Sequence, residues 1–385
     1  MRQSFMAARR PLHDEDIEIL LMPPPLQGLI QKIPTVARIP HRSVLSLAGS
    51  QAPEFLNGIL STLVHSSPRP FYSAFLHAQG RVLYDVFVYT RTNPAGQRGY
   101  LIDYDSRPSE APPLLDLIKR YILRSRVKVR DVSDEYDVWG VWGSPGEEEV
   151  ERHWKWAESS GVAEPAWNTV DEWPWGSQDE MIRDQRAPGM GKRLLVRKGD
   201  RPPDASSHDL ATSDAYTLHR ILRGVPEGST DIPAMQAFPM DSNLDFMGGL
   251  DFRKGCYVGQ ELTVRTYHTG IIRKRIMPVV IHPPDSSPPK VVAPSQNLPS
   301  FASGLDIRGV ANQPTGHDNP TPRPRGNGKL LSSSNGLGLA LLRLEQVEAA
   351  EQGKLAFSMD VETDGTKVSW GVSHWRPDWW PRRVE

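Results

Sequence analysis

Apolar residues alternate between strand-like and helix-like spacing through the first 270 residues of the chain. The clearest pattern is a pair of β-branched and aromatic runs, Phe71–Leu76 and Arg81–Thr90, on either side of the turn sequence His77-Ala78-Gln79-Gly80, which predicts a β-hairpin. Three further runs predict single strands at Ser43–Leu47, Tyr100–Tyr104 and Val127–Val132.

Four segments are predicted to form helices. The first follows Ser50, the expected N-cap, and repeats its apolar residues at Phe55, Leu56, Ile59, Leu60 and Leu63. The other three segments are Leu114–Ile122, Asp214–Arg223 and Gln260–His268. The third helix should stop at Gly224, because glycine adopts the left-handed C-cap conformation most easily and Pro226 follows.

Helical spacing largely stops after residue 270. Four strand-like runs follow: Arg273–Ile281, Leu337–Leu344, Lys354–Val361 and Thr366–Trp375. A small C-terminal β-barrel is the natural prediction, and the fold class of the whole chain is α+β. The expected division is an N-terminal extension (1–32), a body (33–270) and a barrel domain (271–385).

Composition marks two inserts in this plan. Residues 282–330 hold ten of the 35 prolines and few large apolar residues, which predicts a disordered loop, since such a segment buries too little surface to offset its ordering entropy. Seven of the 11 tryptophans lie between Trp139 and Trp175, and most fall in a second insert at about 143–184. That density of aromatic side chains predicts a packed flap. The other four tryptophans are near the C-terminus and should hold it against the body.

Charge and cysteine usage exclude several classes of protein. Lys plus Arg number 45 and Asp plus Glu 46, so no excess positive charge is available for binding nucleic acid. The apolar runs are too short for insertion into a membrane. Cys256 is the only cysteine, so it forms no intramolecular disulfide and cannot by itself make a zinc site. The N-terminal arginines are followed closely by four acidic residues, a pattern unlike an acid-poor transit peptide.

The single thiol lies in the most distinctive segment, Asn243–Arg275, which is rich in glycine and cations. Cys256 precedes the predicted helix Gln260–His268, so the helix dipole and the neighbouring Arg253 and Lys254 are expected to favour the reactive thiolate. The alternative is that Cys256 is a small buried hydrophobic residue, as lone cysteines commonly are.

This segment resembles the signature of the YgfZ family, Lys-Gly-Cys-(Tyr/Phe)-x-Gly-Gln-Glu. The eight matching positions are Lys254, Gly255, Cys256, Tyr257, Val258, Gly259, Gln260 and Glu261. The likeness extends upstream to the sequence from Phe55 to Leu60 and to the hairpin up to Asp85, and downstream to Arg273-Lys274-Arg275. Within that family the chain looks most like the eukaryotic mitochondrial branch, and the long Pro-rich insert fits a fungal member.

The resemblance implies a fold like that of the aminomethyltransferase (T-protein) of the glycine cleavage system. This fold has two interleaved α+β subdomains around a central folate-type cavity, plus a C-terminal β-barrel. The resemblance also implies a late role in iron-sulfur cluster assembly in the mitochondrial matrix, maturing [4Fe-4S] proteins with A-type scaffold proteins and ferredoxin as partners. Cys256 would then be a reactive, catalytic thiol or a transient ligand of a [2Fe-2S] or [4Fe-4S] cluster shared with a partner.

A folate-dependent one-carbon transferase is the alternative function, with tetrahydrofolate as the cofactor. Asp85, Tyr84 and Arg265 are the candidate cofactor-binding residues. The aminomethyl-transferring relatives look to carry two consecutive acids where this chain has Tyr84-Asp85, so aminomethyl transfer loses support. The alternative to a folate-binding role is that Asp85 is a strand residue that faces solvent.

Three further assignments stay open. Arg220 and Arg223 form either a clamp for a polyglutamate tail or, as the favoured interpretation, a solvated helix face. His268 could act with Cys256, as a catalytic pair or as a second cluster ligand, only if the chain folds back. A plainer alternative is a structural adaptor that docks partners through the Trp-rich flap. A non-enzymatic assembly factor is favoured over an enzyme.

Overall fold

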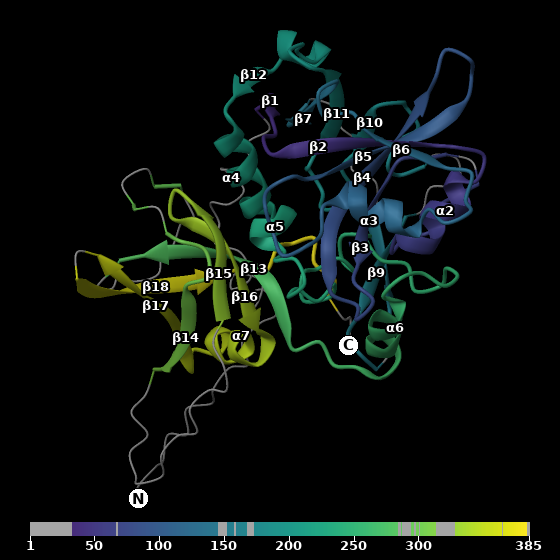
Figure 1. Cartoon of the computed structure of the whole chain (residues 1–385). Helices are drawn as coiled ribbons and strands as arrows, with labels where there is room; N and C mark the ends of the chain where they lie inside the picture. Colours follow the sequence, from purple (N-terminus) through teal and green to yellow (C-terminus); the bar gives the residue numbers. More distant parts are fainter. Residues whose placement is uncertain are drawn as a thin grey trace, which may run out of the picture.

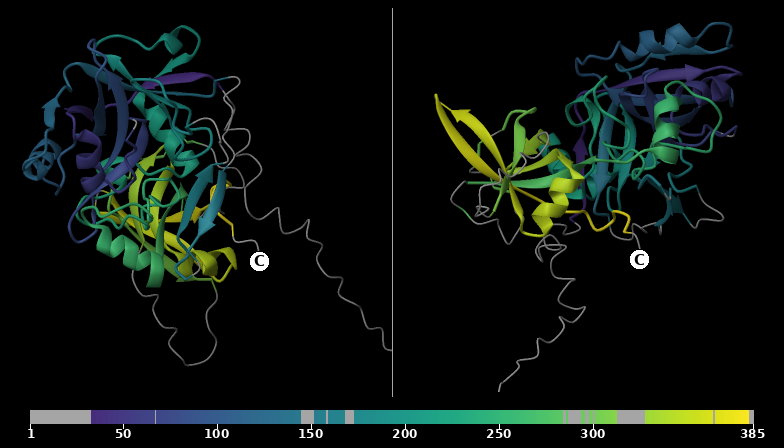
Figure 2. Two further views of the ribbon diagram at one scale, coloured as in Figure 1. Left: turned by 90° about the vertical axis from the view of Figure 1, so that its right-hand side faces the viewer. Right: turned by 90° about the horizontal axis from the view of Figure 1, so that it is seen from below.

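The computed structural model describes residues 33–66, 68–144, 152–157, 159–167, 173–283, 286, 294–295, 298–299, 301–312, 328–363 and 365–382. The N-terminal extension and much of the Pro-rich insert therefore lie outside the described residues. Figure 1 shows a body of two sheets beside a separate barrel, and Figure 2 gives two further views of this arrangement.

The body is built from two five-stranded sheets. The first has the order β10-β11-β7-β1-β12 and the second β3-β4-β5-β2-β6. The strands of the first sheet are β1 (Thr35–Arg38), β7 (Tyr136–Trp142), β10 (Met181–Arg183), β11 (Lys192–Arg197) and β12 (Asp209–Ala211). Those of the second are β2 (Arg42–Ala48), β3 (Phe71–Leu76), β4 (Val82–Thr92), β5 (Arg98–Asp105) and β6 (Lys128–Asp131). The chain supplies β1 to the first sheet, builds the second and returns at β7, so the two subdomains are interleaved.

Most predicted elements of the body are present. The hairpin forms as β3 and β4, and α3 (Leu114–Tyr121) and α4 (Ser213–Arg223) match their predicted helices, with Gly224 in the expected left-handed C-cap. Helix α2 (Ala52–Ile59) differs, because Gln51 and not Ser50 is its N-cap. It is also shorter than predicted: Leu60 bridges to Phe75 of β3, and Leu63 lies beyond the helix with 39% of its surface exposed.

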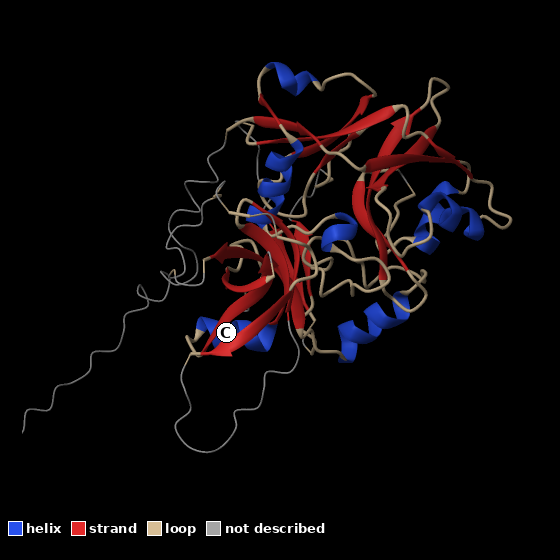
Figure 3. Cartoon of the chain, turned by 60° about the vertical axis from the view of Figure 1, so that its left-hand side comes forward, coloured by secondary structure: helices blue, strands red, loops and turns tan. Residues whose placement is uncertain are grey.

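A closed six-stranded barrel follows the body. Its order is β13-β16-β15-β14-β17-β18, which confirms the predicted barrel. The strands are β13 (Lys274–His282), β14 (Asp306–Ala311), β15 (Gly328–Ser334), β16 (Leu337–Arg343), β17 (Leu355–Thr363) and β18 (Thr366–His374). Figure 3 shows how few helices accompany these strands.

Two features of the barrel differ from the sequence-based expectation. Strand β14 lies inside the stretch expected to be disordered, because Ile307 is fully buried in the barrel and β14 pairs with both β15 and β17. Helix α7 (Leu344–Glu351) was not expected at all, and it packs against the barrel through the buried Val347.

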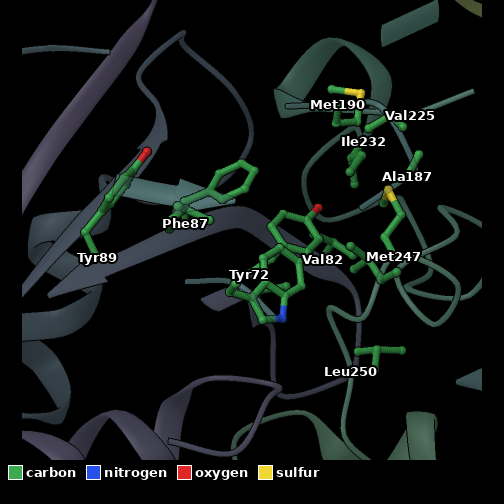
Figure 4. Close-up of a cluster of buried hydrophobic side chains, with 14 of the residues drawn as sticks. Tyr72, Val82, Phe87, Tyr89, Ala187, Met190, Val225, Ile232, Met247 and Leu250 are labelled. Atoms are coloured by element: carbon green, nitrogen blue, oxygen red, sulfur yellow. The ribbon is translucent and has the colours of Figure 1, made fainter. Parts of the chain in front are cut away.

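Separate apolar clusters hold these parts together. The largest draws side chains from both sheets, including Ala37 and Leu195 from the first and Tyr72 and Phe87 from the second. Figure 4 shows part of this cluster, with Met247 and Leu250 from the segment before Cys256. None of the described helices is long and apolar enough to cross a membrane.

The Trp-rich insert forms a packed hairpin of β8 (Arg152–Trp156) and β9 (Ala163–Trp167), as expected. Trp154 contacts Phe246 edge to face, with ring centroids 5.8 Å apart. At the C-terminus, Trp380 is buried against Phe246, and Trp379 Nε1 donates to the Arg223 carbonyl at 2.8 Å. The C-terminal tryptophans therefore fix this end of the chain as predicted.

Candidate functional site

Cys256 lies on an exposed loop between Leu250 and helix α6 (Gln260–Thr269), whose N-cap is Gly259. The interpretation of Cys256 as a buried hydrophobic residue is therefore wrong. Gly255 beside it is also exposed, whereas Tyr257 and Gly259 on the other side are buried. The loop thus presents its thiol to the surface from a fixed base.

One side of the loop is bonded to the C-terminal end of α2. Lys254 Nζ donates to the carbonyls of Asn57 at 2.7 Å and Leu60 at 2.6 Å, so its ammonium caps carbonyl groups that the helix leaves free. The Val258 N–H donates to the Gly58 carbonyl at 3.1 Å. Burial lowers the pKa of Lys254 to about 8. Lys254 therefore has a structural partner in α2 that the sequence pattern did not indicate.

The other side of the loop is fixed by α6 and the β3–β4 turn. Gln260 Oε1 accepts from the Tyr257 N–H at 3.1 Å, and the Tyr257 hydroxyl lies 3.0 Å from Thr263 Oγ1. Gly259 has φ +82°, and a Cβ there would collide with the His77 carbonyl in the turn between β3 and β4. Only glycine can adopt this positive φ and also fit against the His77 carbonyl without strain.

The Trp-rich hairpin forms a third support. Arg253 makes an ion pair of 3.0 Å with Glu164 of β9, and 58% of the Arg253 side chain is exposed whereas Glu164 is almost fully buried. Burial raises the pKa of Glu164, and Arg253 opposes that rise. At the far end of α6, Ser159 Oγ donates to the His268 carbonyl at 2.6 Å.

Helix α6 exposes Glu261, Arg265 and His268. The structure does not bring His268 to Cys256: Cys256 precedes the N-terminus of α6 and His268 lies near its C-terminus, and the eight steps from Gln260 to His268 alone span about 12 Å. Among the described residues, no three His, Cys, Asp or Glu side chains are grouped to hold a metal ion. Arg265 is exposed on α6, whereas Asp85, another candidate cofactor-binding residue, is buried.

Tyr84 and Asp85 of β4 face opposite sides of the second sheet. The Tyr84 hydroxyl donates to the Pro112 carbonyl at 2.8 Å, and burial raises the pKa of Tyr84 to about 12. Asp85 is buried between the sheets, so its interpretation as a solvent-facing residue is wrong. Asp85 Oδ1 accepts from the Gly228 N–H at 3.0 Å, and burial raises the pKa of Asp85 above its ordinary value.

Buried charges that the sequence analysis did not single out surround Asp85. We call Arg42, Asp103, Arg186, Arg193 and Glu227 the central ion-pair cluster. A signal was present in the strands, because Asp103 follows Leu101 at the spacing of one sheet face and should share its burial. The favoured interpretation of Arg220 as a solvated residue is also wrong, because Arg220 is buried and pairs with Asp231 at 2.7 Å. Arg223 is half-buried on the same helix.

The space between the sheets bears on tetrahydrofolate, the cofactor that this fold implies. A pocket of about 90 Å³ lies beside the central ion-pair cluster, lined among others by Arg42, Tyr216 and Glu227. Pockets for ligands of that size measure about 300–1,000 Å³. This pocket is too small for such a ligand and Asp85 does not line it, so it does not identify a tetrahydrofolate site. Asp85 Oδ2 has no hydrogen-bond partner among the described residues.

Comparison with known proteins agrees with this geometry. Residues 273–382 match the family model of the CAF17 C-terminal beta-barrel domain. The crystal structure of glycine cleavage system aminomethyltransferase T from Bartonella henselae superposes with a TM-score of 0.53 at 14% identity, covering 90% of this chain and 87% of that one. This confirms the T-protein-like fold expected from the sequence.

Curated relatives cover most of the chain. A protein of Cryptococcus neoformans var. neoformans serotype D, named iron-sulfur cluster assembly factor IBA57 homolog, mitochondrial, is 41% identical over 332 residues, or 82% of this chain and 85% of its own length. A protein of the same name from Mycosarcoma maydis is 34% identical over 373 residues, or 90% of this chain and 85% of its own. The chain therefore belongs to the family of IBA57 mitochondrial iron-sulfur cluster assembly factors.

Proposed function

We propose that this protein supports iron-sulfur cluster assembly in mitochondria by presenting Cys256 as one ligand to a cluster that a partner protein also holds. The observation that carries the proposal is the exposed thiol on a loop whose two sides are bonded to α2 and α6. A loop held in this way loses little conformational freedom when a partner binds.

A shared cluster follows from the number of ligands. Iron-sulfur clusters generally need four thiolate or imidazole ligands, and Cys256 is the only cysteine of the chain. The remaining ligands would come from the partner. We propose an A-type scaffold protein for that role, ferredoxin as the electron donor, [4Fe-4S] proteins as the recipients and the mitochondrial matrix as the compartment.

Formation of a cluster-bridged complex tests this function. The protein is mixed with a [2Fe-2S]-loaded A-type scaffold protein, and the complex is followed by size-exclusion chromatography and visible circular dichroism. Wild-type protein should form a coloured complex and change the spectrum of the cluster, whereas Cys256→Ala should do neither. Glu348→Gln is the control, because Glu348 is exposed on α7, outside the signature around Cys256, and has no ion pair with the described residues. A spectrum unchanged by Cys256→Ala would contradict the proposal.

Folate-dependent transfer remains the second candidate because of the unpartnered Asp85 Oδ2. The pocket beside the central ion-pair cluster is too small for folate and does not include Asp85, so no step of the proposed function is assigned to folate. Calorimetric titration with tetrahydrofolate, in wild-type protein and in Asp85→Asn, tests this candidate. Binding that is lost in the variant would reinstate folate chemistry, and the absence of heat at near-millimolar ligand would remove it.

A further inference from the structure

Two glycines near Cys256 have no explanation in the folded chain. Most described glycines either adopt a positive φ or would bring a Cβ into contact with a neighbour. Among all the glycines that the structure describes, Gly58 and Gly255 alone have neither property, since an added Cβ would meet nothing within 4 Å at either position. Neither backbone conformation nor internal packing requires glycine there.

These two glycines lie at the same place on the molecule. Gly58 is the penultimate residue of α2, and its carbonyl accepts the Val258 N–H from the cysteine loop. Gly255 directly precedes Cys256 and follows Lys254, whose ammonium binds the α2 carbonyls on either side of Gly58. A stretch of backbone without side chains therefore borders the thiol. We call Gly58 and Gly255 the bare backbone patch.

Two amide groups on the cysteine loop beside this patch are free to bind a ligand. Within the described part of the chain, the N–H groups of Gly255 and Cys256 have no hydrogen-bond acceptor, and both residues are exposed. Arg253 and Lys254 precede them, while Asp251 and Glu261 are the nearby acids in sequence. An iron-sulfur cluster with thiolate ligands is anionic, and N–H groups commonly donate hydrogen bonds to its sulfur atoms.

We propose that the bare backbone patch lets the sulfide face of a partner-held iron-sulfur cluster approach Cys256 closely, and that the Gly255 and Cys256 N–H groups donate hydrogen bonds to its sulfides. This inference rests on the proposed function. It adds that two residues beside the thiol determine which ligand the thiol can reach. Gly58 and Gly255 are then specificity-determining positions, because a methyl group at either one would occupy the space of the cluster.

The inference predicts opposite effects on stability and on binding. Glycine destabilises a helix relative to alanine, so Gly58→Ala should raise the Tm of the free protein. Gly255→Ala should leave the Tm at or above that of the wild type. Both variants should nevertheless weaken the complex with a [2Fe-2S]-loaded A-type scaffold protein by about tenfold. In each variant the alkylation rate of Cys256 by iodoacetamide should stay unchanged, since a small reagent needs little space.

Gly353→Ala supplies the matched control. Gly353 also has open space around its Cβ position, but it has φ +70° and lies between α7 and the barrel strand β17. The same substitution there should lower the Tm and leave the complex unchanged. This pattern is the reverse of the one expected for the bare backbone patch.

The outcomes separate this inference from the proposed function. Full affinity and an unshifted cluster spectrum in both Gly58→Ala and Gly255→Ala would overturn the inference and leave the role of Cys256 intact. A complex that forms equally well with Cys256→Ala would overturn the proposed function, and the inference with it. Slower alkylation of Cys256 in the glycine variants would also contradict the inference, because the methyl group would then be acting on the thiol and not on the cluster.

Discussion

Glu227 links three arginines of the central ion-pair cluster, and replacing it with glutamine tests how far that cluster holds the two sheets together. Its carboxylate lies 2.8 Å from Arg186, 3.1 Å from Arg193 and 3.8 Å from Arg42. The Tyr216 hydroxyl also donates to it at 2.8 Å. Glutamine keeps the size and one acceptor but removes the charge.

The expected loss follows from these distances. At an effective dielectric constant of about 20, each arginine contact is worth about 4–6 kcal/mol of Coulomb energy, and the desolvation of the buried ions opposes most of it. Removing one partner of such a buried set costs about 3–5 kcal/mol in the free energy of unfolding, since charge remains buried without compensation. That is a large part of the 5–15 kcal/mol typical of a folded domain.

Urea denaturation followed by tryptophan fluorescence measures this loss at pH 7. Burial acts to raise the pKa of Glu227, but Arg193, Arg186 and Arg42 hold it well below the ordinary value of 4.5. The carboxylate therefore stabilises the fold above about pH 4.5, and this contribution declines as the pH falls further. Glu261→Gln on the exposed face of α6 should change stability by less than about 0.5 kcal/mol. A loss below 1 kcal/mol in Glu227→Gln would refute the reasoning.

Three further predictions concern the frame around the site. Gly259→Ala should cost about 1–3 kcal/mol, because φ is +82° and the new methyl group meets the His77 carbonyl, and thermal denaturation measures it. Phe246→Ala should cost about 3–5 kcal/mol by opening a cavity against Trp380, with the barrel losing protection from hydrogen exchange first. Burial lowers the pKa of His219 from 6.5 to about 3, so stability should fall as the pH drops from 6.5 towards 5, and His219→Gln should flatten that slope.

Elements with strong local signals were predictable from the sequence. The hairpin of β3 and β4 has alternating apolar residues around a short turn, and α4 ends at a glycine that takes the left-handed conformation. The local sequence preferences of these elements agree with their tertiary contacts, so the predicted conformation is the one that forms.

Other elements depend on distant partners. Helix α7 carries a local signal, since Leu344–Glu351 consists mainly of strong helix formers, and it was missed because the apolar run of strand β16 leads directly into it. Strand β14 has few apolar residues and becomes ordered through pairing with β15 and β17. The stability of β14 comes from barrel closure, because the strands that pair with it lie outside any local window of the sequence.

The site shows the same division. The motif singled out Cys256 as the candidate reactive thiol, and the structure shows this side chain exposed. The motif could not show that the Lys254 ammonium binds two backbone carbonyls that lie 197 and 194 residues away in the chain. The central ion-pair cluster was missed because charged residues in strands usually face solvent, and only the packing of two sheets buries Asp103 and Arg193.

The central claim is that the protein supports cluster assembly through the exposed thiol of Cys256. The most direct test is aconitase activity in cells depleted of the protein and supplied with either wild type or Cys256→Ala, at equal protein levels and with a [2Fe-2S] protein measured in parallel. The account predicts that Cys256→Ala accumulates normally, because the exposed side chain contributes little to stability, yet fails to restore aconitase. Restoration of aconitase by Cys256→Ala to the wild-type level would contradict it.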